Sequence, residues 1–123
     1  MILEEGSKVL IVHRRLFEND HSRFFLGVVD AYEQGVAKVR GNTWIRDTFT
    51  AEYFKKEDVR TKLVAVSSGT LMVYELPLET DMQAIRLIFE KDGKLALTDG
   101  KKLHSDLSEA EHTKTIRKGN RTL

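Results

Sequence analysis

The sequence predicts a mainly β protein, a small barrel or sandwich of about seven strands with at most one or two short helices. Segments rich in β-branched and aromatic residues recur at short intervals, and glycine, aspartate or asparagine residues punctuate them. The chain has 123 residues, of which 41% are hydrophobic and 32% charged, as in a folded domain with one core. We therefore expect a single domain over residues 1–107 and a basic, mobile tail over residues 108–123.

The first half of the chain contains the clearest strand signals. Residues 7–17 predict a strand that is apolar on both faces at its centre and therefore buried. Residues 23–32 predict a second strand, in which Gly27 marks a bulge, a bend or a close backbone approach. Gly35 stands where a hairpin requires a positive φ, so residues 36–46 are expected to return as the partner strand.

The second half is less regular. Residues 47–60 are ambiguous, because their aromatic residues have helical spacing but equally suit an irregular strand, and we expect one short helix or turn there. Residues 62–67 and 70–76 flank Ser68-Gly69 and predict a tight hairpin. Further strands are expected over residues 84–90, 94–98 and 102–107.

Composition excludes several classes of function. Twenty basic and nineteen acidic residues leave a net charge of +1, so no global field draws the chain to nucleic acid or anionic lipid. The absence of cysteine excludes disulfides, thiol catalysis and thiolate metal sites, and it fits a reducing compartment. Glu4 and Glu5 are unlike the basic start of a secretory signal, and no apolar run is long enough to span a membrane. The expectation is a cytoplasmic protein without a membrane partner.

The histidines are the only candidates for catalysis or metal binding. A hairpin could bring His13 and His21, with Asp20 beside it, together as metal ligands or an acid–base pair, but their spacing matches no known metal motif. His104 and Asp106 share a strand face without needing a joint task. We therefore predict no catalytic residue, no metal site and no cofactor, and keep a small-ligand or metal-dependent protein using His13 and His21 as an alternative.

A basic surface suggests a second alternative, binding of nucleic acid, RNA in particular. Basic side chains alternate on one face of the third predicted strand, and Trp44 offers a ring on which a base could stack. Charged strand residues usually face water, however, and a tryptophan is more often a core or interface anchor. The candidate nucleic-acid-binding residues are Arg14, Arg15, Lys38, Arg40, Trp44, Arg46, Lys114, Arg117 and Lys118.

One segment resembles a known class of fold. Residues 24–44, FFLGVVDAYEQGVAKVRGNTW, resemble the bent central strands of small SH3-like and Sm-like barrels, as in uncharacterised bacterial domains of that shape. Sm-like proteins begin with a helix and carry an aspartate and an asparagine at their RNA-binding loops. Neither motif is present here, so no RNA-binding residue is carried over. The resemblance implies ring-like or dimeric assembly through exposed strand edges.

Self-association also has a physical argument. Several segments are apolar on both faces, as in KVLIV, KLVAV and TLMVY, whereas a small barrel has only one interior. A second subunit could cover the other face, or two packed sheets or residues 48–54 could cover it within one chain. The first hypothesis is therefore a non-enzymatic binding or assembly module that acts as a homo-oligomer, with its site along a strand edge or subunit junction.

Overall fold

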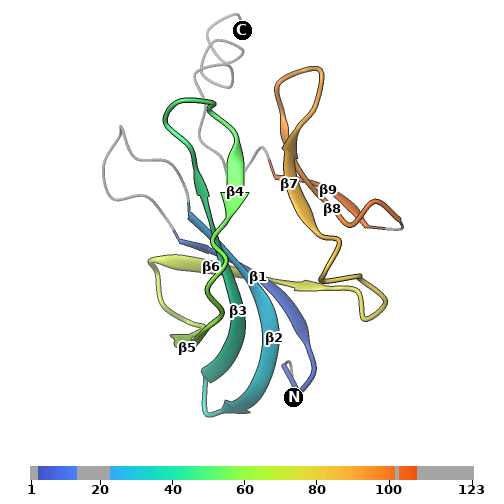
Figure 1. Cartoon of the computed structure of the whole chain (residues 1–123). Coiled ribbons are helices and arrows are strands. Elements are labelled where there is room, and N and C mark those ends of the chain that lie inside the picture. The colour runs from blue at the N-terminus through green and yellow to red at the C-terminus, as the bar shows by residue number, and fades with distance from the viewer. Residues whose placement is uncertain (1–2, 14–22, 102, 108–123) are drawn as a thin grey trace, which may run out of the picture.

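The computed structural model describes residues 3–13, 23–101 and 103–107, and these residues contain nine strands and no helix (Figure 1). The strands are β1 (Lys8–His13), β2 (Arg23–Glu33), β3 (Val36–Arg46), β4 (Tyr53–Lys55), β5 (Arg60–Ala65), β6 (Leu71–Leu76), β7 (Arg86–Phe89), β8 (Leu95–Thr98) and β9 (His104–Asp106). The mainly β class is confirmed, with more strands than the sequence predicts. In the described part of the chain no helix could cross a membrane.

The strands form two antiparallel sheets. The larger sheet has six strands in the order β4-β3-β2-β1-β6, and β5 pairs with the same edge of β3 as β4 does, farther along the strand. The smaller sheet has the order β7-β8-β9. The larger sheet does not close into a barrel, because β5 pairs only with β3 and β6 pairs only with β1.

The predicted hairpin between β2 and β3 is confirmed. Glu33 pairs with Val36, and both residues between them, Gln34 and Gly35, have positive φ angles of 48° and 82°. Two successive positive φ angles are the geometry of a two-residue turn whose twist matches that of the flanking strands. The turn therefore sets the register of the two longest strands.

These two strands bend where two glycines face each other. Gly27 is the ladder partner of Gly41, and a Cβ atom on Gly41 would lie 2.0 Å from the Leu26 carbonyl oxygen and 2.6 Å from the Gly27 Cα. Farther along, the register shifts between Val29 and Ala31, which marks a bulge. The predicted bend at Gly27 is thus a close approach of two backbones that only glycine permits.

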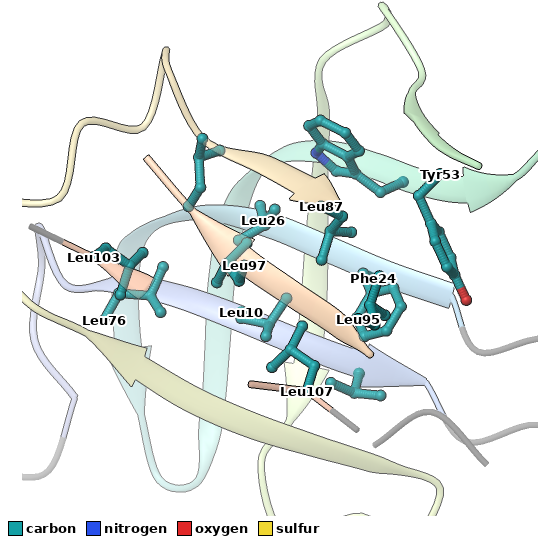
Figure 2. Close-up of a cluster of buried hydrophobic side chains, with 13 residues drawn as sticks. Leu10, Phe24, Leu26, Tyr53, Leu76, Leu87, Leu95, Leu97, Leu103 and Leu107 are labelled. Atoms are coloured by element: carbon teal, nitrogen blue, oxygen red, sulfur yellow. The ribbon is translucent and has the colours of Figure 1, made fainter. Parts of the chain in front are cut away.

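The curl of the sheet gives it two buried faces. Val9 and Ile11 of β1 lie in one cluster, and Leu10 and Val12 lie in another, each at most 1% exposed. The inner core, on the face over which the sheet folds, comprises Leu3, Val9, Ile11, Phe25, Val29, Ala37, Val39 and Val64. The intersheet core comprises Leu10, Val12, Phe24, Leu26, Trp44, Tyr53, Leu76, Ile85, Leu87, Leu95, Leu97, Leu103 and Leu107. Figure 2 shows its leucines from β1 and β2 facing those of β7 and β8.

The helix considered for residues 47–60 is not formed. The Asp47 side chain instead accepts hydrogen bonds from the backbone N–H groups of Phe49 (2.7 Å) and Thr50 (3.3 Å), which makes a turn. Ala51 then takes a positive φ of 63°, and β4 follows. Local bonding by the aspartate side chain competes with helix formation, and the spacing of the aromatic residues does not overcome it.

The hairpin predicted for residues 62–67 and 70–76 is also wrong. The two segments are strands, β5 and β6, but β5 pairs with β3 and β6 pairs with β1. The residues between them do turn, with the Ser68 N–H bonded to the Ala65 carbonyl at 3.0 Å. The turn redirects the chain across the sheet and does not place the two strands side by side.

Asp99 joins the smaller sheet to residues 77–85, the segment that connects β6 to β7. This residue is only 3% exposed, and its carboxylate accepts backbone N–H bonds from Asp81 (3.0 Å), Lys101 (2.8 Å) and Leu103 (3.1 Å). These bonds, that from Asp81 foremost, lower the pKa of Asp99 below its ordinary value of 3.8. Lys8 ties the same segment to β1 through the carbonyls of Leu78 and Thr80, both at 2.6 Å.

Replacing Gly41 with alanine is expected to destabilise the protein by about 3 kcal/mol, because the new methyl group meets backbone that cannot rotate away. The Gly69→Ala variant is the matched control, since a Cβ there meets nothing within 4 Å. Urea unfolding measures both variants. Equal midpoints for the two would contradict the role assigned to the glycine pair.

Asp99→Asn is expected to lower the thermal unfolding temperature at neutral pH, because an amide is a weaker acceptor and places its own donors against N–H groups. Since folding lowers the pKa of Asp99, its contribution is present above pH 3.8 and is lost as pH falls through the folded value. Asp92→Asn is the control, because this exposed carboxylate accepts one N–H, from Lys94. A loss no larger than in the control would refute the prediction.

Candidate functional site

Several of the predicted site residues lie outside the described part of the chain. They are Arg14, Arg15, Asp20, His21, Lys114, Arg117 and Lys118. The pairing of His13 with His21 and the basic tail therefore stay predictions. Among the described residues, no three His, Asp or Glu side chains are placed to bind a metal ion together.

Of the predicted basic surface, Lys38 and Arg40 lie side by side on the outward face of β3, and both are exposed. The Arg40 guanidinium is bonded to the Asp30 carboxylate at 3.3 Å, in an exposed pair. An exposed ion pair contributes little to stability, but it offsets part of the positive charge. Nucleic-acid binding by this face stays a prediction.

Trp44 and Arg46 make structural contacts. Trp44 is 7% exposed and belongs to the intersheet core, so little of its ring can reach a ligand. The Arg46 guanidinium lies 5.1 Å from the centre of the Phe89 ring, and its Nε donates to the Ala51 carbonyl at 2.8 Å. The aromatic and the arginine thus hold the β3–β4 hairpin against the smaller sheet.

His104 is exposed, and its Nε2 lies 3.3 Å from a Glu90 carboxylate oxygen. Both side chains of this pair are exposed.

The most distinctive feature is a gap in the larger sheet between β5 and β6, which we call the seam. No Cα atom of β5 lies within 8 Å of a Cα atom of β6, although residues 66–70 connect the two strands directly. Within the described residues, β5 and β6 therefore each keep one unpaired edge. Neighbouring strands in a sheet are about 4.8 Å apart, so one additional strand paired to both β5 and β6 would require these two strands to be about 10 Å apart.

An apolar pocket lies beside the seam. Its volume is about 230 Å³, and its lining residues are Leu3, Tyr32, Val66, Leu71, Met72, Val73 and Glu75. Val66 follows β5, whereas Leu71 and Val73 lie on β6, and all three pack against the inner core. The pocket is thus the place where the inner core opens between the two unpaired edges.

Sequence reasoning missed the pocket but not the strands that form it. The segments KLVAV and TLMVY were identified as apolar on both faces and in need of a cover. The hairpin predicted at Ser68-Gly69 would have paired these two strands with each other, so no gap between them was expected. The pairing of β5 with β3 is what opens the seam.

No family model matches the chain. It likewise matches no curated protein and no solved structure. Function is therefore inferred from the residues and their geometry alone.

His13 is the last residue of β1, and its ladder partner on β6 is Leu71, which lines the pocket. Its Nε2 is buried and has no hydrogen-bond partner among the described residues. Burial lowers the pKa of His13 below its ordinary value of 6.5, and the positive charges of Lys62 and Arg23 lower it further. The imidazole is thus held in its neutral form more strongly than in the unfolded chain.

The free energy of unfolding is expected to fall as pH is lowered below 6.5, because the unfolded chain binds a proton that folded His13 resists. The charged groups that oppose protonation of His13 are Arg23 on β2 and Lys62 on β5. The β6 neighbour of His13, Leu71, is uncharged. Urea unfolding between neutral and mildly acidic pH measures the effect. His13→Leu should flatten the profile and the exposed-site control His104→Leu should not, and an unchanged slope in His13→Leu would disprove the assignment.

Proposed function

We propose that this protein is a non-catalytic binding module that captures an extended segment of a partner protein at the seam. The observation that supports the proposal is the combination of two unpaired strand edges and an apolar pocket beside them. In recognition by strand addition, the open edge supplies backbone hydrogen bonds and a pocket for alternate side chains supplies specificity. Both elements are present at the seam.

The size and chemistry of the pocket favour a peptide over a small molecule. Small-molecule sites usually enclose about 300–1,000 Å³ with several convergent polar groups. This pocket has about 230 Å³, and Glu75 is the only carboxylate that lines it. It has room for one apolar side chain, and its lining offers little for acid–base catalysis.

A segment of another protein is a better occupant than a second copy of this chain. The main argument for self-association was that strands apolar on both faces need a cover, and for β1 both faces are covered within one chain. The large apolar side chains that stay exposed on β5 and beside it are Val59 (64%), Leu63 (74%) and Val36 (42%), and the last two lie on the outward face beside Lys38. Three such residues make a small patch, smaller than a stable dimer interface requires.

Two finer features belong to the same proposal. The SH3-like shape is supported by the bent β2–β3 pair with Gly27 at the bend and a tight turn between the strands, since the segment 24–44 resembles bent central strands of that kind. The cytoplasm is the proposed compartment because the sequence has no cysteine for disulfides.

A displayed library of random linear peptides tests the proposal. Selection on the folded protein is expected to enrich peptides with an apolar residue at a fixed position, and binding should protect β6 amides from hydrogen exchange. Val66→Phe, which fills the pocket, should weaken the selected peptides by at least about tenfold, as the loss of one buried side-chain contact would.

Leu63→Phe is the matched control. It enlarges an exposed side chain on the outward face of β5 and leaves the pocket open. Light scattering on a sizing column should show a monomer with and without peptide. A dimer whose formation Val66→Phe prevents would make the second copy the occupant and overturn the proposed partner. Selection that yields no saturable, Val66-dependent binder would overturn the proposed function.

A further inference from the structure

The inner face of the sheet changes from apolar to basic at one end. His13 of β1 and Arg23 of β2 are ladder partners, and side chains of directly paired residues lie on the same face. His13 stands two residues after Ile11 on β1, and Arg23 stands two residues before Phe25 on β2. Ile11 and Phe25 both belong to the inner core. Because alternate residues of a strand share a face, His13 and Arg23 continue the inner face to its end.

Lys62 reaches the same place from β5. It stands two residues before Val64, which packs in the inner core, and so it shares that inward face. Its ammonium lies 4.6 Å from the centre of the Phe25 ring, and Phe25 is two residues from Arg23 on β2. Two residues of a strand span about 6.8 Å, so the guanidinium and the ammonium can reach one small ligand together.

Among the described residues, no carboxylate balances these positive charges. Neither Arg23 nor Lys62 forms an ion pair within the described ranges, whereas Arg60 on the same face of β5 is bonded to Asp58 at 2.7 Å. Burial lowers the pKa of Lys62, and the charges of Arg60 and Arg23 lower it further, with no carboxylate acting against them. A half-buried ammonium that rests on an aromatic ring is therefore available to an anion.

We propose that Arg23 and Lys62 bind a phosphate group at this end of the inner face, with His13 beneath it. A phosphate monoester carries about −1.5 to −2 charges at pH 7, which matches two cationic side chains, whereas a carboxylate would balance only one. Guanidinium and ammonium groups are the usual protein ligands of a phosphate group. The group belongs either to a small phosphorylated metabolite or to a phosphorylated side chain of a partner.

The test uses His13 as the reporter. Its ring resonances are followed by NMR against pH at fixed ionic strength, with added sulfate, acetate, adenosine monophosphate or a phosphoserine peptide. Sulfate keeps a double negative charge over this range, and it should raise the pKa of His13 saturably, because a bound anion opposes the charges that lower it. Acetate should have no saturable effect, and the tighter of the two phosphate esters identifies the source of the group.

Lys62→Met keeps the apolar stem over Phe25 and removes the charge. It should raise the pKa of His13 without any anion and weaken sulfate binding by at least about tenfold. Lys94→Met, an exposed lysine on the turn before β8, is the matched control and should change neither. Val66→Phe should leave the sulfate effect intact, so this site and the peptide site fail separately. No saturable shift with sulfate, or an equal shift with acetate, would overturn the proposal.

Discussion

The close approach of β2 and β3 at Gly27 and Gly41 is the constraint on which the larger sheet depends. A side chain at either position would collide with the backbone of the opposite strand, so the two paired strands approach each other there with no side chain between them. The approach bends both strands and lets the sheet fold over its own face. The inner core exists because of that curl, and the curl stops before β5 and β6 pair. The seam and its pocket therefore follow from a contact between two backbones.

The two faces of the larger sheet are covered by different means, and this division separates structure from proposed function. The smaller sheet packs on one face, from Leu10 and Leu26 across to Leu97. The sheet folds over its other face, which forms the inner core. This face stays open at two places, at the pocket beside Leu71 and at the end of β1 at His13. Leu71 both lines the pocket and pairs with His13, so the apolar and basic borders meet at this residue.

Sequence reasoning predicted what local interactions determine. The β2–β3 hairpin followed from Gly35, and the turn at Ser68-Gly69 was placed correctly, but the strands on either side were given the wrong partners. The partners of β5 and β6 lie far away in the sequence, and nothing within residues 62–76 encodes them. The seam is an absence of pairing, which no motif marks. Lys62 resembled an ordinary strand residue because its position over Phe25 depends on the curl.

The position of β1 between β2 and β6 has a consequence for the order of folding. Its second partner, β6, is reached only when residue 8 finds residue 76, whereas β2 and β3 meet through a two-residue turn. Closing so long a loop costs chain entropy before any contact repays it, and topologies rich in such pairs fold slowly. Until then β1 presents a strand with four consecutive apolar residues, 9–12, and one open edge, the kind of segment that recruits other chains during synthesis. The strand that anchors both cores in the finished protein is thus its most vulnerable segment while the chain is incomplete.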